Sequence, residues 1–551
     1  MPAVPAISKL VNRGGIIRSS GVVGGFTMLS RALGLVRDVL MASVFGTSAA
    51  MSAFVIAFRI PNLFRRLFGE GALSSAFIPV FAEALERDGK DAAWSLARKI
   101  VTMFGLLLLG IVLLGVLLAG LARAGLPGPD PAAAGAAGSH GASLVAQARR
   151  VLPLFQILFP YMFFICLVAL SMGVLNSFDH FALPAATPCL LNCVWIVALL
   201  ALSPLFGPSQ DQRIFGVAWG ILGAGLVQLV VQLPALMRRG YLPGLSFAWR
   251  DARVRKVLLL MGPAALGMGI TQINILVDNA LAFFVGTWAP AALFYAERLI
   301  YFPLGIFATA LGTVLLPVFS RHAARLRPDQ IRATLNQSLR MLMFVMVPAA
   351  VGLLVLARPI IRLLFERHDF TAVSTMLTAR ALLFYAPGLV AFSLCKVFVP
   401  AFYSQQDTRT PVRIGIRIVG LNIALNLLFV ITFPLYFKHA GLALATVLAE
   451  TTNGVVLGYI LHRRLGDPGW ARIAGSILRV LGAAAVMGGA AWYLHAVLER
   501  VVCGTALHAK LAQAVAVLGT IGAAIVVYLL AAALLRCREL GEIRKSLECG
   551  S

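Results

Sequence analysis

The sequence predicts an all-α polytopic membrane protein with about fourteen transmembrane helices, built as two six-helix lobes followed by a C-terminal helix pair. Three observations support this fold class. The 551 residues are 60% hydrophobic and only 13% charged, with a mean hydropathy of +0.89, which a soluble domain with a polar exterior does not reach. Apolar runs of about 20 residues or more recur along the chain, each long enough to cross a bilayer as a helix. An internal repeat relates the first half of the chain to the second.

The predicted spans follow from the length of each apolar run, and continuous runs favour helices over the alternating strands of a barrel. They lie near residues 21–46, 51–82, 98–122, 150–177, 184–206, 214–237, 256–286, 290–319, 338–357, 373–402, 411–434, 440–462, 474–497 and 510–535. The expected parts are an N-terminal extension at 1–20, lobes at 21–240 and 250–463, a helix pair at 470–537 and a cytoplasmic tail at 538–551. The first span lacks a cleavage site and should act as its own insertion signal.

Basic residues predict the orientation. The net charge is +25, but much of the Lys and Arg lies in short loops between spans, where the positive-inside rule operates. This explains the charge without a nucleic-acid partner and predicts that both termini are cytoplasmic. One loop on that side, residues 403–411, holds Asp407, which is expected to pair with Arg409 or to cap the next helix.

The sequence contains no motif of an enzyme. It has no GxxxxGK[ST], HExxH or GxSxG, so the chain is not expected to be an enzyme. Its seven cysteines suggest no disulfide framework. Cys189 and Cys193 are one helical turn apart, but no His or further Cys accompanies them to make a metal site.

The repeat is visible in residue pairs that share one offset in numbering. The same separation in residue number relates Pro160 to Pro387, Ser177 to Ser404, and Pro184 to Pro411. In the second and eighth spans slightly larger offsets, which differ from each other by one residue, relate Arg59 to Arg298 and Pro79 to Pro317. Equivalent spans are an even number apart, which predicts parallel repeats about an axis along the membrane normal.

Charged residues inside the spans predict the site. They are Arg31, Arg37 and Asp38 in the first span, Arg59, Arg65, Arg66 and Glu70 in the second, and Glu297 with Arg298 in the eighth. The arginines outnumber the carboxylates and several lie too deep to reach water, which favours a cationic, water-filled cavity between the lobes. Because a guanidinium matches phosphate oxygens, the pattern predicts an anionic, phosphorylated substrate. Pro61 bends the second span, so either Arg65 or Arg66 can face the cavity.

A second polar group lies in the other half. It consists of Asp278, Asn422, Asn426 and Thr446, which fall in the seventh, eleventh and twelfth spans. Their oxygen atoms suit a sodium ion, which would be the only bound cofactor. Hydrogen bonding between helices is the alternative.

Four stretches resemble one known family. They are SRALGLVRD, FRIPNLFRRLFGEGALSSAFIPVFAE, YAERLIYFPLGIFATALGTVLLP and AFYSQQDTRTPV, and together they are similar to the MurJ (MviN) lipid II flippases of the multidrug/oligosaccharidyl-lipid/polysaccharide exporter superfamily. The resemblance implies alternating-access translocation of lipid II, an undecaprenyl-pyrophosphate-linked disaccharide pentapeptide, across the bacterial cytoplasmic (inner) membrane for cell wall biogenesis. It implies that Arg31, Arg37, Arg65 with Arg66, and Arg298 are cavity residues with Asp38 and Glu70 as acidic partners, and that the last two helices form a groove for the lipid tail.

The chain departs from the family pattern at two positions. Ser52 stands where close relatives carry Asp, and Asn426 stands where the family's sodium site can use a second carboxylate.

Other functions remain open. A flippase for another polyprenyl-pyrophosphate-linked glycan would share the cationic cavity, whereas a drug or cation antiporter of the same superfamily would need an acidic one. A membrane scaffold would need no intramembrane arginine.

Overall fold

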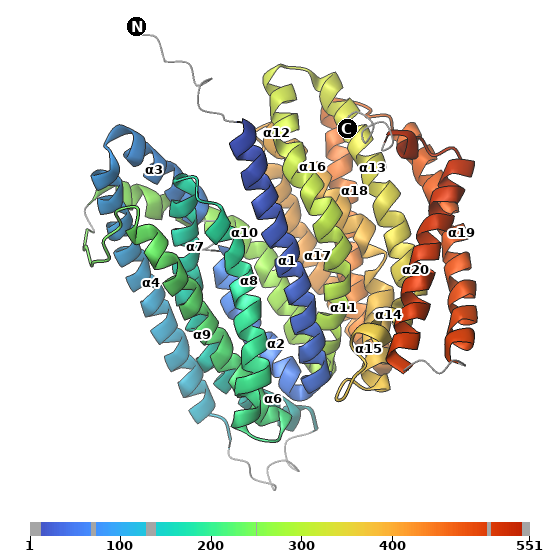
Figure 1. The fold of residues 1–551 in the computed structure, drawn as a ribbon, viewed down its shortest axis with the longest axis horizontal. Helices are drawn as coiled ribbons and strands as arrows, with labels where there is room; N and C mark the ends of the chain where they lie inside the picture. The colour runs from blue at the N-terminus through green and yellow to red at the C-terminus, as the bar shows by residue number, and fades with distance from the viewer. Residues whose placement is uncertain (1–12, 68–72, 128–138, 249–250, 504–508, 543–551) are drawn as a thin grey trace. The chain divides into compact units, whose positions relative to one another are not determined.

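The computed structural model describes residues 13–67, 73–127, 139–248, 251–503 and 509–542, and helices dominate them (Figure 1). Within these residues, ten helical segments are long and apolar enough to cross a membrane. The number is eleven if α15 (Ala372–Tyr385) and α16 (Gly388–Ser404), which meet at a bend of 45°, form one span. The prediction of an all-α polytopic membrane protein is therefore confirmed.

The chain divides into two compact units, residues 1–276 and 277–551. The first contains α1 (Arg13–Phe45), α2 (Ala49–Phe64), α3 (Leu73–Arg87), α4 (Lys90–Ala124), α6 (Ser139–Leu158), α7 (Tyr161–Ser177), α8 (Ala182–Val197), η3 (Ala198–Leu202), η4 (Ser203–Phe206), α9 (Gln210–Met237) and most of α10 (Ala252–Val285).

The second unit contains the end of α10, followed by α11 (Ala289–Pro303), η5 (Leu304–Ala308), α12 (Thr309–Ala324), α13 (Pro328–Val355), α14 (Ala357–Leu364), α15, α16, α17 (Arg409–Thr432), η6 (Leu435–Phe437), α18 (Lys438–Leu465), α19 (Trp470–Cys503) and α20 (Ala509–Leu534). The eleven candidate spans correspond to the predicted spans from the third to the sixth and from the eighth to the fourteenth. The other three coincide with α1, with α2 followed by α3, and with α10. Charged residues interrupt the apolar runs of the first two: Arg31, Arg37 and Asp38 in α1, and Arg59, Arg65 and Arg66 in and after α2.

The internal repeat appears in the helix boundaries. Helices α7 and α16 begin and end at the offset that relates Pro160 to Pro387, and α8 and α17 begin at the same offset. Each helix of the first pair is preceded by a proline, which lacks the N–H that a first helical turn leaves without an intrahelical partner. After each, the chain turns through a residue with positive φ: 57° at Asp179 and 59° at Gln406. The sequence separation thus reflects one structural unit used twice.

Packing within each unit follows the same pattern. In the first unit α7 packs on α9, α2 on α6, and α4 on α7. Their counterparts in the second unit make the same pairs: α16 on α18, α11 on α15, and α13 on α16. Helices that are equivalent in sequence therefore also make equivalent contacts inside their own unit.

A further repeated feature is a short π-helical turn. Residues 65–67, after α2, have π-type hydrogen bonding, and η5, after α11, is a π-helical segment at the equivalent place in the second unit. A π turn inserts an extra residue and changes which side chains share a helix face, and such turns are frequent at functional sites. Arg65 and Arg66 lie in the first of these turns.

The last two helices are fixed to their own unit through α13. In Figure 1, α19 and α20 lie side by side at the red end of the chain, and α19 packs on α13. Arg340 of α13 forms ion pairs with Glu539 at 2.6 Å and Glu542 at 2.8 Å, just after α20. The hydroxyl of Tyr528 donates to the carbonyl of Phe344 at 2.6 Å. These contacts anchor the helix pair to α13.

Candidate functional site: intramembrane arginines and a polar cluster

Arg37 and Asp38 form a buried ion pair in α1. The Arg37 guanidinium donates from Nη2 and Nε to Oδ1 of Asp38, at 2.7 and 3.0 Å. The two residues are 9% and 5% exposed. Because a guanidinium and a carboxylate in so little contact with solvent each cost much to desolvate, the pairing is what makes their burial tolerable.

Helix α8 completes the surroundings of this pair. Oδ1 of Asn192 accepts from Nη1 of Arg37 at 2.9 Å, while its Nδ2 donates to the Ser30 carbonyl at 3.0 Å. The Arg37 guanidinium also lies 4.3 Å from the centre of the Trp195 ring. Sequence reasoning did not identify Asn192 or Trp195. The available signal was an Asn and a Trp close together in an otherwise apolar helix.

Arg31 has a different environment from Arg37. Because Arg37 follows Arg31 by six positions in an α-helix, their side chains point about 120° apart around the axis of α1. Arg31 is half-buried, and among the residues that the structure describes it has neither a hydrogen-bond nor an ion-pair partner. The geometry therefore assigns Arg37 to the contact of α1 with α8. Ligand binding by Arg31 stays a prediction.

The arginines of the second span lie before its π turn, at Arg59, and within it, at Arg65 and Arg66. Arg59, Arg65 and Arg66 are half-buried, and Nε of Arg65 donates to Oδ1 of Asn62 at 2.9 Å. That bond orients Arg65 along its own helix; which of Arg65 and Arg66 faces a cavity stays a prediction. Glu70 lies outside the described residues.

Arg298 is the counterpart of Arg59 in the second unit. It is half-buried in α11, with its guanidinium 4.4 Å from the centre of the Phe294 ring, one turn earlier. Its neighbour Glu297 accepts a hydrogen bond from the Tyr385 hydroxyl of α15 at 3.5 Å. The aromatic ring supports the cation without neutralising it, because a cation–π contact adds no counter-charge.

The four residues proposed for sodium come together, from three helices. Nδ2 of Asn426 donates to Oδ1 of Asp278 and to Oδ1 of Asn422, both at 2.6 Å. Nδ2 of Asn422 lies 3.5 Å from Oγ1 of Thr446, whose hydroxyl donates to the Leu442 carbonyl. Asn422 is 1% exposed and Asn426 is fully buried. Sequence reasoning thus identified a real cluster joining α10, α17 and α18.

The arrangement inside this cluster is that of hydrogen bonds. A cation shared by Asp278 and Asn422 would have to lie between their oxygens, and the Asn426 amide nitrogen occupies that position. The donor types suit a hard cation, and in this arrangement the Asn426 amide group binds two of the oxygens that such a cation would use. Sodium binding there stays a prediction, and no transport step depends on it.

The comparisons with known proteins identify the family. The family model described as "Lipid II flippase MurJ" matches residues 41–511. The "Probable lipid II flippase MurJ" of Vibrio cholerae serotype O1 is 37% identical over 457 residues, covering 81% of this chain and 83% of that protein. The "Lipid II flippase MurJ" of Burkholderia cenocepacia is 34% identical over 481 residues, covering 86% and 89%.

Solved structures agree with the sequence comparison. The "Lipid II flippase MurJ, inward closed conformation" aligns with a TM-score of 0.74 at 25% identity, covering 93% of this chain and 98% of that one. A multidrug resistance MATE family transporter in an inward-facing conformation aligns with a TM-score of 0.60 at 14% identity, covering 81% and 97%, and so shares the fold alone. The chain belongs to the MurJ lipid II flippase family.

Proposed function

We propose that this chain is a flippase that moves lipid II from the inner to the outer leaflet of the bacterial cytoplasmic membrane, where it supplies peptidoglycan synthesis. The observation that carries the proposal is the family match over residues 41–511. A flippase is a transporter and not an enzyme, since it moves its substrate without changing it. No described feature favours a different polyprenyl-linked glycan.

The diphosphate of lipid II would bind to guanidinium groups in a cavity between the two lobes. Arg31, Arg65 or Arg66, and Arg298 are the candidate ligands, with Arg59 nearby in sequence. Two charge-assisted hydrogen bonds per guanidinium would replace the water that a diphosphate loses on entering the membrane. The carboxylates of Glu70 and Asp38 would limit the net positive charge of this cavity.

Arg37 and Asp38 would act as positioning residues. The Arg37 guanidinium is already held by Asp38, Asn192 and the Trp195 ring. The pair would fix the rotation of α1 against α8 and thereby the direction in which Arg31 points. This role needs no direct contact with lipid II.

Movement of the diphosphate would occur by alternating access. Two lobes at 21–240 and 250–463 would rock against each other, and the cavity would open to each side of the membrane in turn. An inside-negative potential favours outward movement of a net negative charge by about 2.3 kcal/mol per charge per 100 mV.

The polyprenyl tail would stay in the lipid beside the helix pair at 470–537, whose apolar side chains Leu478, Trp492 and Leu518 are more than 60% exposed. Both termini, including the tail at 538–551, would be cytoplasmic.

The test is translocation of labelled lipid II in cells whose own flippase can be depleted. Arg31→Ala and Arg298→Ala should each lower the rate at least about tenfold, because each removes a charge-assisted contact to the diphosphate. The matched control is Arg87→Ala, since Arg87 is exposed and pairs with Glu83 in its own helix. A wild-type chain that restores transport of another polyprenyl-linked glycan but not of lipid II would contradict the proposal.

A further inference from the structure

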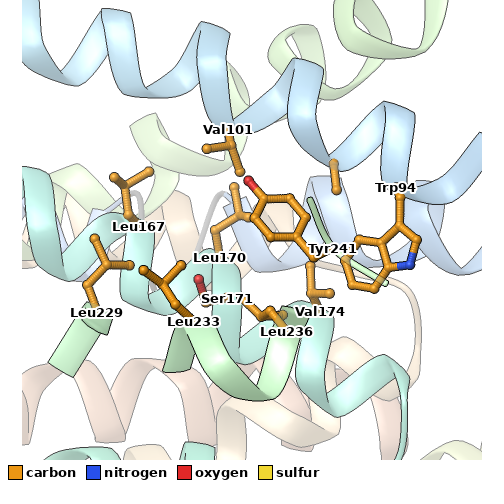
Figure 2. Close-up of a pocket in the computed structure, with 11 residues that line it drawn as sticks. Trp94, Val101, Leu167, Leu170, Ser171, Val174, Leu229, Leu233, Leu236 and Tyr241 are labelled. Carbon is orange, nitrogen blue, oxygen red and sulfur yellow. The ribbon is translucent and has the colours of Figure 1, made fainter. Parts of the chain in front are cut away.

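A small cleft lies inside the first unit, and its lining includes none of the intramembrane arginines. Its volume is about 110 Å³, and α4, α7 and α9 form its walls, with the Tyr241 ring between them (Figure 2). Its lining is apolar except for Ser171 and the Tyr241 hydroxyl, and the other lining residues are Trp94, Ala97, Val101, Leu167, Leu170, Val174, Leu229, Leu233 and Leu236. Such a cleft offers water almost no hydrogen-bond partner.

The cleft is lined by side chains that differ in burial. Trp94, Leu170 and Val174 are buried, whereas Val101, Leu229 and Leu233 are half-buried. The adjacent side chains of α9 are apolar and exposed: Leu226 is 48% and Val230 is 50% exposed. Because an apolar cleft that opens into hydrocarbon gains dispersion contacts when a chain fills it, an acyl chain is the fitting occupant.

Basic residues lie near Trp94 and Tyr241. The Trp94 indole N–H donates to the Arg239 carbonyl at 3.1 Å, which brings residues 238–241 against α4. Burial raises the pKa of Tyr241, and the nearby Arg98 charge opposes this rise. We call Arg98, Arg238 and Arg239 the basic rim. Within the part of the chain that the structure describes, none of the three has an acidic partner, whereas neighbouring Lys99 pairs with Asp251 at 2.7 Å.

We propose that this cleft and the basic rim bind one anionic phospholipid, such as phosphatidylglycerol, from the leaflet on the side of residues 238–241. One acyl chain would lie in the cleft between α4 and α9. The lipid phosphate would bind the guanidinium groups of Arg98 and Arg239, which match phosphate oxygens in geometry and charge. Basic pockets between membrane helices are suited to such headgroups. The inference does not depend on the proposed transport of lipid II.

The test compares melting temperatures of the purified full-length protein with phosphatidylglycerol and with phosphatidylcholine at equal mole fraction. The wild type should be stabilised more by phosphatidylglycerol. Two changes should each remove more than half of that difference: the double variant Arg98→Ala/Arg239→Ala, which removes the charges, and Leu233→Trp, which fills the cleft. Arg87→Ala should keep the full difference, because Arg87 is exposed and already paired.

Three outcomes would overturn the proposal. The first is equal stabilisation of the wild type by the two lipids. The second is an undiminished preference for phosphatidylglycerol in the double variant. The third is displacement of bound phosphatidylglycerol by a polyprenyl diphosphate at equimolar concentration, measured by native mass spectrometry, which would assign the cleft to the transported lipid.

Discussion

Asn426 of α17 donates its side-chain N–H to a carboxylate oxygen of Asp278 in α10, with a nitrogen–oxygen distance of 2.6 Å. The same nitrogen is 2.6 Å from Oδ1 of Asn422, so one amide group bridges two acceptors inside the membrane-spanning part of the chain. A partly positive NH₂ group thus occupies the place that a bound cation would take. The cluster is held together by the chain's own atoms.

This arrangement predicts how the cluster responds to sodium. The melting temperature of the wild type should be the same in sodium chloride and in choline chloride at equal ionic strength. Asn426→Asp replaces the bridging donor with a second carboxylate beside Asp278, and the repulsion between them is relieved when a cation binds. The variant should therefore melt lower than the wild type in choline and recover in sodium.

The control for this measurement is the double variant Asp278→Asn/Asn426→Asp, which restores a single carboxylate and should lose the sodium response. A sodium-dependent rise in the melting temperature of the wild type would instead favour the predicted sodium site.

A second prediction concerns the buried pair in α1. Asp38→Asn removes the counter-charge of Arg37 and leaves a buried guanidinium, which typically costs about 3–5 kcal/mol. Arg37→Met/Asp38→Leu removes both charges and should cost much less. Thermal unfolding of the wild type, Asp38→Asn and the double variant in detergent measures the order of their stabilities. If Asp38→Asn were as stable as the wild type, the ion pair would not contribute to holding α1 against α8.

The third prediction is a pH dependence at the loop after α16. Hydrogen bonds from the Thr410 hydroxyl and backbone N–H, together with the Arg464 guanidinium, lower the pKa of Asp407 to about 2. Because the folded pKa is depressed, the stabilisation is present above the unfolded value of about 3.9 and is lost as the pH falls toward 2. The difference in melting temperature between wild type and Asp407→Asn should thus be constant from pH 7 to 5 and shrink below about pH 4. A difference that does not change with pH would assign the effect of the variant to something other than this charge.

The fourth prediction concerns the anchor of the helix pair. Arg340→Ala leaves Glu539, which is 1% exposed, without its guanidinium partner, although Ser476 still donates to it at 2.8 Å. Hydrogen exchange should become faster in α20 than in α16 of the same variant, because the region after α20 loses its ion pairs to α13 and keeps the Tyr528–Phe344 hydrogen bond. Arg362→Ala is the matched control, since the Arg362 side chain is about half exposed and its ion pairs with Glu366 and Glu499 contribute little. Unchanged exchange in α20 after Arg340→Ala would show that the ion pairs of Arg340 do not contribute to holding the pair.

The sequence predicted the helices and the repeat well because both depend on local pattern. Apolar run length determines where a helix can cross the membrane, and turn chemistry repeats with it: the offset that relates Pro160 to Pro387 also relates Asp179 to Gln406, the positive-φ residues after α7 and α16. The polar cluster around Asn426 was also predictable, because polar side chains inside apolar spans seek one another. The sequence could not predict that hydrogen bonds join its residues, because an amide can offer either its oxygen or its nitrogen to a neighbour.

Pairings between distant residues were the weaker part of the prediction. Asp407 was expected to pair with Arg409 or to cap the next helix. It does accept the Thr410 N–H in the first turn of α17, but its ion-pair partner is Arg464, from the end of α18. Asn192 and Trp195 escaped notice because their partner, Arg37, lies far away in the sequence, in a different helix. Likewise, the π turn at residues 65–67 depends on the hydrogen-bond register of the backbone, which side-chain pattern does not report.

The most direct test of the central claim is the affinity of the purified protein for lipid II, measured for the wild type, Arg31→Ala, Arg298→Ala and the control Arg87→Ala. If guanidinium groups inside the spans bind the diphosphate, each of the first two variants should bind at least about tenfold more weakly and the control should bind as the wild type does. Wild-type affinity in both Arg31→Ala and Arg298→Ala would contradict the account.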